Sequence, residues 1–169
     1  MLPMALDPKR AEDSATEMVQ VVLPNDANPL GFILGGTVMH LIDIAGAIAS
    51  YRHARQRVVT AAVDDLQFLH SIKVGDLIIL KARVTCTFHT SIEVRVDVFS
   101  EEPLTGDRQL TSRAFLTFVA IDEAGRKVEV PPLLVEDEAQ AALCREAQTR
   151  RAHRLERRAQ ARSTKSASA

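Results

Sequence analysis

The 169-residue sequence is poor in the residues that nucleic-acid-binding surfaces use. It has no tryptophan and a single tyrosine, so aromatic side chains on which bases could stack are scarce. Its formal net charge is −1, so the chain as a whole is not attracted to a polyanion. We therefore expect no nucleic-acid partner.

Cysteines and long apolar runs are also scarce. Cys86 and Cys144 fall in different predicted elements without metal-site spacing, so we predict no metal, no disulfide framework and a reducing compartment. No segment reaches about 18 apolar residues without a charge, which argues against a membrane span. The stretch Met1–Arg10 is too short and polar for a secretory signal, and we expect a cytoplasmic protein.

The length fits one domain with a core and two tails. Residues 1–16 have mixed charge and no apolar periodicity, which predicts a flexible leader. The predicted strands are Met18–Leu23, Val58–Leu69, Leu77–Phe88, Ile92–Phe99 and Gln109–Ile121. Short loops join the last four, so we predict an antiparallel sheet packed on one long helix, an α+β arrangement. Apolar and charged residues alternate in Ile92–Phe99, which predicts one solvent-facing side.

Residues 133–169 are rich in alanine, arginine, glutamate and glutamine, which favour helix. Between Arg145 and Lys165 there are seven arginines, one lysine and two glutamates. We predict a charged helix that packs lightly on the surface or at a subunit contact, with a disordered tail at Ser163–Ala169. A sharper alternative is that the arginines bind phosphate groups, although runs of charge are more often solvated faces.

The candidate site begins at Asn28, in a loop that leads into a nearly apolar helix predicted over residues 35–53. Asp43 is the only carboxylate in this helix, which we expect to be buried on nearly all sides, where an unpaired charge is costly. Gly36 and Asp43 are seven residues apart and share one helix face. The first-turn N–H groups at Gly35 and Gly36 could receive a polarised carbonyl oxygen. The alternative is that the glycines permit close packing and that neighbours satisfy Asp43.

Several short motifs follow one another in an order that is typical of one family. They are Asn28-Pro29-x-Gly31, Gly35-Gly36, Ile42-Asp43-Ile44-Ala45-Gly46, Val58-Val59-Thr60-Ala61 with Phe68, Val74-Gly75-Asp76, Thr90-Ser91 and Phe118-Val119-Ala120. Together they resemble the acyl-CoA thioester hydrolase family of the hotdog fold, with the cytosolic acyl-CoA hydrolases and their bacterial relatives as the nearest group. The resemblance covers roughly residues 19–132.

The resemblance implies a single hotdog domain over residues 17–132, in which a curved antiparallel sheet wraps a long central helix. It implies hydrolysis of fatty acyl-CoA to free CoA and a carboxylic acid. It also implies a homo-oligomer, at least a dimer and in full a trimer of dimers. No metal or redox cofactor is implied. Coenzyme A would be part of the substrate and is not counted as a cofactor.

The family's catalytic pair corresponds to Asn28 and Asp43, contributed by opposite subunits of a dimer. The resemblance assigns oxyanion or substrate binding to Gly35, Gly36, Thr60, Thr90 and Ser91. Asp43 would be the general base that activates water or, as the less favoured role, the nucleophile. Asn28 would orient the water or the carbonyl group.

The chain departs from the family before the Thr90-Ser91 pair, where Phe88-His89 replace a glycine and a basic residue. His40 lies three residues before Asp43, a spacing at which helical side chains can meet, and a core or interface histidine is the favoured interpretation. A histidine–aspartate pair would also suit a hotdog hydratase or dehydratase, and a non-catalytic acyl-CoA-binding module is a third hypothesis. The neighbours Asp64 and Asp65 should point to opposite faces of a strand, which makes them a poor acid/base pair.

Overall fold

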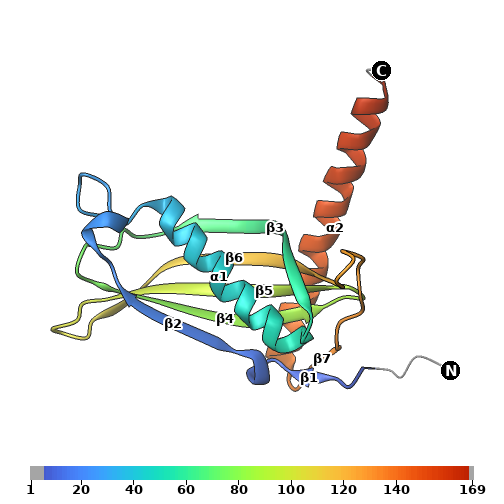
Figure 1. Ribbon diagram of the computed structural model, residues 1–169, viewed down its shortest axis with the longest axis horizontal. Helices are drawn as coiled ribbons and strands as arrows, with labels where there is room; N and C mark the ends of the chain where they lie inside the picture. Colours follow the sequence, from blue (N-terminus) through green and yellow to red (C-terminus); the bar gives the residue numbers. More distant parts are fainter. Residues whose placement is uncertain (1–5, 168–169) are drawn as a thin grey trace.

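The computed structural model describes residues 6–167, with side chains described as far as Ser163, and is organised around one five-stranded antiparallel sheet (Figure 1). The strands are β2 (Thr16–Val21), β3 (Arg57–Phe68), β4 (Leu77–Thr87), β5 (Ser91–Glu101) and β6 (Arg108–Ile121). Their order across the sheet is β2-β4-β5-β6-β3, so β2 and β3 are the edges. The five predicted strands are confirmed, with ends that differ by a few residues.

Helix α1 (Gly35–Ala54) lies across one face of this sheet, as predicted (Figure 1). Its buried residues recur every three or four positions and form a stripe toward the sheet. They include Val38, Leu41, Ile42, Ala45, Gly46 and Ala49. Helix and sheet approach closely at Gly46, where a β-carbon would lie 2.9 Å from the Phe118 ring. Helix and sheet together confirm the hotdog arrangement that the resemblance implies.

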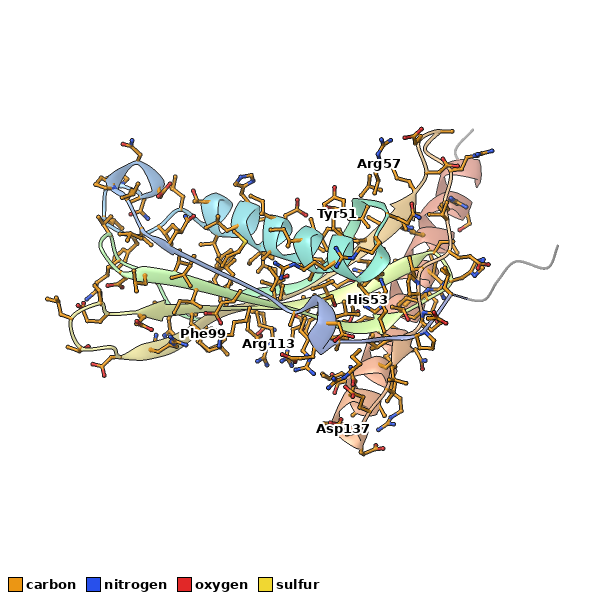
Figure 2. All side chains as sticks on the ribbon, turned by 60° about the horizontal axis from the view of Figure 1, so that its bottom comes forward. Tyr51, His53, Arg57, Phe99, Arg113 and Asp137 are labelled. Carbon is orange, nitrogen blue, oxygen red and sulfur yellow. A yellow bond between two sulfur atoms is a disulfide. The ribbon has the colours of Figure 1, made fainter. Side chains whose placement is uncertain are left out.

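The opposite face of α1 is open, which differs from the predicted burial on nearly all sides. Met39, His40 and Tyr51 are exposed on it, and Asp43 is half-buried. Figure 2 shows Tyr51 pointing away from the sheet. One sheet can cover only one side of a helix, so the remaining apolar surface of α1 needs a second cover.

The N-terminal segment is more ordered than the predicted leader. Strand β1 (Lys9–Arg10) pairs in parallel with β7 (Leu133–Leu134), and a short 3-10 helix, η1 (Glu12–Ser14), follows. Between β1 and η1, Ala11 is fully buried. A second 3-10 helix, η2 (Pro24–Asp26), precedes the α1 loop. Residues 1–5 of the predicted leader lie outside the described part of the chain.

Helix α2 (Glu138–Ala167) crosses the sheet on the face opposite α1 (Figure 2). It is longer than predicted, because residues 163–167 are helical where the sequence suggested a tail, and residues 168–169 are not described. Near its start, Cys144 forms a disulfide with Cys86 of β4. The prediction of unpaired cysteines is therefore wrong. The two residues are 58 positions apart and meet only because α2 folds back onto the sheet.

Two arginines of α2 reach carboxylates of the sheet. Arg150 donates hydrogen bonds of 2.8 and 3.0 Å to Glu93 of β5, and Arg154 Nη1 lies 2.6 Å from Asp64 Oδ2 of β3. The Arg150 guanidinium also lies 3.8 Å from the centroid of the Phe115 ring. Glu93 is only 1% exposed, so the predicted solvent-facing side of β5 is wrong where α2 covers it. Both arginines are already paired with buried carboxylates and do not fit the phosphate-binding alternative.

Residues 6–167 contain no helix with the length and apolar character required to cross a bilayer. The same residues contain no group of three or more histidine, cysteine or acidic side chains that could hold a metal ion.

Candidate active site

Asp43 lies in the third turn of α1, and a side chain of the sheet holds it in place. Thr60 Oγ1 of β3 donates a hydrogen bond of 2.6 Å to Asp43 Oδ1. Within residues 6–167, no arginine or lysine forms an ion pair with Asp43, and Oδ2 has no hydrogen-bond donor. A carboxylate that is fixed at one oxygen and open at the other suits a general base that must take a proton from water.

The amino end of α1 is open at the glycine pair. The preceding residue, Leu34, has no side-chain acceptor with which to cap the first N–H groups of the helix. A β-carbon at Gly36 would meet no atom within 4 Å, whereas one at Gly35 would lie 3.6 Å from the Phe68 ring. Gly36 is thus not required for close packing inside this chain. The open N–H groups, at the positive end of the helix dipole, could stabilise an oxyanion.

Asn28 is fixed by its own loop. Its Oδ1 accepts hydrogen bonds from the backbone N–H groups of Leu30 at 3.0 Å and Phe32 at 3.3 Å, and its own N–H donates to the Phe32 carbonyl at 2.8 Å. Its Nδ2 has no hydrogen-bond partner in the described part of the chain. The amide group is therefore oriented by the loop and keeps its donor for another molecule.

Asn28 and Gly35 share a pocket of about 440 Å³ beside the amino end of α1. The remaining lining residues are Leu30, Phe32, Ile33, Val38, Phe68, Leu69, His70, Ser71, Ile72 and Ser112. The volume falls in the range of roughly 300–1,000 Å³ that small-molecule sites occupy, and the lining is mostly apolar. The sequence did not single out Ser112, because β6 brings it to the pocket from a distant part of the chain.

The predicted site residues form two separate groups around α1. Asp43 and Thr60 are in contact, and Asn28 and Gly35 share the pocket. Among residues 6–167 no hydrogen bond joins Asn28 to Asp43.

The predicted pair Thr90 and Ser91 lies apart from both groups, at the β4–β5 connection. Ser91 and Val59 are both cross-strand partners of Val119, so they lie on the same face of the sheet. Thr60 follows Val59 and lies on the other face, toward α1. One chain therefore does not bring all seven predicted residues together.

Three further titratable groups that the sequence singled out take no part in these contacts. His40 is exposed, and no hydrogen bond joins it to Asp43 within the described residues. Asp64 is buried against Arg154 of α2, whereas Asp65 is exposed and has a positive φ of 52° in a bulged part of β3. The two aspartates thus have different surroundings and, as predicted, do not form an acid/base pair.

Comparisons of the sequence with known proteins point to one family. A family model described as the thioesterase superfamily matches residues 30–106. The chain is 39% identical over 122 residues to YkhA of Bacillus subtilis, named an uncharacterized acyl-CoA thioester hydrolase, and the match covers 72% of this chain and 71% of YkhA. It is 33% identical over 135 residues to the human cytosolic acyl coenzyme A thioester hydrolase, covering 78% of this chain. The match spans only 35% of that longer human protein.

Solved structures are similar over nearly the whole chain. An apo-hexameric acyl-CoA thioesterase is 41% identical with a TM-score of 0.86, covering 91% of this chain and 99% of the other. An acyl-CoA hydrolase from Staphylococcus aureus, solved with butyryl coenzyme A, is 33% identical with a TM-score of 0.84, covering 92% and 95%. Structures of its alanine variants exist for an asparagine, an aspartate and a threonine that carry the same numbers as Asn28, Asp43 and Thr60 here. Fold and sequence together show that the chain belongs to the acyl-CoA thioester hydrolase family of the thioesterase superfamily.

Proposed function

We propose that the protein is an acyl-CoA thioesterase that hydrolyses fatty acyl-CoA to free CoA and a carboxylic acid. The observation that carries this proposal is the 2.6 Å hydrogen bond from Thr60 to Asp43, on the open face of a helix whose amino end is uncapped. The arrangement provides a fixed base and, at the same helix, donors for a developing negative charge.

In the proposed mechanism, Asp43 Oδ2 takes a proton from a water molecule whose oxygen attacks the thioester carbonyl carbon. The carbonyl oxygen becomes negative and is stabilised by the N–H groups of Gly35 and Gly36. The tetrahedral intermediate expels the CoA thiolate, which takes the proton from Asp43. A carboxylic acid and a thiol result, and no metal or redox cofactor takes part.

We propose that Asn28 of a second subunit completes the site. Its Nδ2 lacks a partner among the described residues of its own chain, and the open face of α1 lacks a cover, so a second copy could satisfy both. That the Staphylococcus aureus enzyme was solved as alanine variants at residues with these three numbers is in keeping with the choice of Asn28, Asp43 and Thr60. Thr90 and Ser91 would contact the CoA part of a substrate bound to another subunit.

We propose a dimer that forms through edge strand β3, with three dimers in a hexamer. Val59 and Val63 of this strand are 45% and 49% exposed, which leaves an apolar edge unpaired. Similar structures include the apo-hexameric thioesterase and a hexameric thioesterase from Yersinia pestis. These two hexameric structures support a hexamer for this chain as well.

We propose a cytoplasmic location, in keeping with the human relative named cytosolic. The Cys86–Cys144 disulfide is evidence against a cytoplasmic location, because thiols are kept reduced in that compartment. When the pair is reduced, Arg150 and Arg154 would still anchor α2 to the sheet.

The proposal is tested with Asp43→Asn, which keeps the shape of the side chain and removes the base. Thiol release from butyryl-CoA and longer acyl-CoAs should fall by at least about 100-fold, while circular dichroism stays unchanged. Parental activity in this variant would refute the role of Asp43.

Incubation with an enoyl-CoA, with its saturated analogue and with acyl-CoA tests the hydratase and binding-module hypotheses. A hydratase would add water to an enoyl-CoA and leave the saturated analogue intact, and a binding module would retain acyl-CoA without releasing thiol. The exposed position of His40 gives the hydratase hypothesis no support from geometry.

A further inference from the structure

Helix α2 crosses the strands of the sheet in spatial order and then extends past its edge. Cys144 is bonded to β4, Arg150 to β5 and Arg154 to β3. Arg158 Nη2 reaches the Ala61 carbonyl of β3 at 3.5 Å. Beyond that residue, α2 continues to Ala167 and projects past β3, at the top of Figure 1.

The projecting part is long enough to lie on a neighbouring sheet. Nine residues follow Arg158 in α2, and at about 1.5 Å per residue they extend roughly 14 Å. Adjacent strands are about 4.8 Å apart, so this length corresponds to two or three strands. If the edge of β3 pairs with another β3, the projecting part of α2 would lie over the partner's sheet.

A groove of about 600 Å³ runs between one face of α2 and the edge strand β3. It is lined by Val63, Asp64, Asp65, Arg150, His153, Glu156, Arg157 and Gln160. Arg150 and Asp64 are each engaged by a partner in the same chain. The exposed charged groups of the groove are the acidic Asp65 and Glu156 and the basic Arg157, together with the titratable His153. Arg157 Nη2 lies 3.9 Å from Asp64 Oδ1 and keeps most of its side chain exposed.

We propose that this groove, together with the projecting part of α2, is an interface for the α2 helix of a second copy of the chain. In a two-fold dimer the same patch is used by both subunits, so it must be complementary to itself. A patch that carries both Arg157 and Glu156 meets this condition, because each charge can face its opposite on the partner. The surface is also continuous with the edge of β3, so the two α2 helices would lie antiparallel across the joined sheets.

The proposal rests on the β3 pairing of the proposed function, and its test is independent of hydrolysis. Two variants carry opposite charge in the groove. The acidic variant is His153→Glu with Arg157→Glu, and the basic variant is Glu156→Arg with Asp65→Asn. Asparagine is used at position 65 because it tolerates the positive φ found there.

The two variants are expressed separately and together, with tags of different mass, and their assemblies are counted by native mass spectrometry. Like charges should weaken each variant's own dimers, and co-expression should yield mixed dimers in about tenfold excess over the statistical proportion. Charge contacts within one chain cannot favour mixed dimers. Circular dichroism of each variant shows whether α2 remains folded.

A matched control places the same change of charge outside the groove. Gln148→Glu with Lys127→Glu, co-expressed with the basic variant, should assort statistically. Statistical assortment of the groove variants, or an equal excess of mixed dimers with the control, would overturn the α2 interface. If mixed dimers form as expected but no acyl-CoA is hydrolysed, the interface stands and the proposed function fails.

Discussion

Thr60 is the residue through which the sheet controls the position of the candidate base. Its hydroxyl donates to Asp43 Oδ1 at 2.6 Å from a strand that is itself an edge of the sheet. A hydrogen bond to a charged group is worth about 1.5–3 kcal/mol, which corresponds to roughly 10- to 100-fold in rate if it acts in the transition state.

We therefore expect Thr60→Val to lower kcat by roughly 10- to 100-fold with little change in KM, because the valine has the same shape but cannot donate. Steady-state thiol release measures both constants. Thr60→Ser keeps the donor and serves as the control, with activity close to parental. Equal activity of the valine and serine variants would contradict a positioning role for this hydroxyl.

His53 at the end of α1 is completely buried, and it links folding to pH. Its Nε2 lies 2.9 Å from the Pro131 carbonyl, and its Nδ1 has no partner among the described residues. Burial lowers the pKa of His53 below its ordinary value, and the bond to Pro131 opposes this only in part. The nearby charges, Lys9 and Asp13, act on this pKa in opposite directions. The neutral imidazole is therefore the favoured form in the folded protein.

Because the pKa of His53 is lower in the folded state, His53 of the unfolded chain takes up its proton at a higher pH than His53 of the folded chain. Above the unfolded value of about 6.5 the residue is neutral in both states, and its contribution to stability is fully present. As the pH falls below about 6.5, the free energy of unfolding should decrease by up to about 1.4 kcal/mol per pH unit. Urea denaturation between pH 5 and pH 8 measures this slope. It should become shallower in His53→Gln and stay unchanged in His40→Gln, whose side chain is exposed.

At the scale of elements, the attachment of α2 depends on a buried ion pair. Glu93 is 1% exposed, and Arg150 donates two hydrogen bonds to its carboxylate. Thr85 of β4 donates a further one, at 2.7 Å. Removing one charged partner leaves the other charge buried without compensation, which costs roughly 3–5 kcal/mol.

We expect Arg150→Met to destabilise the protein by this amount in thermal or chemical denaturation. The double variant Arg150→Met with Glu93→Leu should recover much of the loss, because no buried charge remains. Arg145→Met changes a surface pair with Glu138 and should cost at most about 1 kcal/mol. A loss at Arg150 as small as that at Arg145 would show that solvent reaches Glu93.

The elements differ in how far the sequence predicted them. The four strands after the helix show period-two patterns, the first strand is a short β-branched run, and α1 has an apolar run after a glycine pair. These local signals place them close to their observed bounds. The pairing of β1 with β7 and the Cys86–Cys144 disulfide join distant segments through residues with no local pattern. Glu93 looked solvent-facing because its partner Arg150 is 57 residues away.

The candidate site was predictable to a similar extent. Gly36 and Asp43 were identified because an open helix end and a carboxylate are unusual in an apolar helix, whereas the role of Asn28 came from the family resemblance. Residue spacing could not predict the contact between Thr60 and Asp43, since β3 and α1 meet only in the folded chain. The open face of α1 contradicted the predicted burial because the sequence of one chain does not indicate which apolar surface another copy will cover.

At the scale of the whole molecule, activity should depend on assembly. If Asn28 and Asp43 of one site come from different subunits, a monomer has no complete site. Val63 on the unpaired edge of β3 is 49% exposed, and a dimer formed at this edge would cover its apolar side chain.

We expect Val63→Lys to block pairing at this edge, since a lysine there would place a positive charge on the apolar surface that the proposed dimer buries. Size-exclusion chromatography with light scattering should show monomers, and thiol release should fall together with the oligomer fraction. Val74→Lys, at another exposed position, is the control and should leave both unchanged. A monomeric but fully active variant would contradict a shared site.

One cross-strand pair of the sheet, Thr60 opposite Phe118, serves both the packing of α1 and its chemistry. The Phe118 ring packs against α1 at Gly46, and Thr60 donates a hydrogen bond to Asp43, one turn earlier in the helix. Any side chain at position 46 would raise the helix from the aromatic ring and lengthen the 2.6 Å bond between Thr60 and Asp43. Evolution of the core and of the catalytic group should therefore be coupled: among homologues, we expect alanine at position 46 only where the residue at position 118 is smaller than phenylalanine.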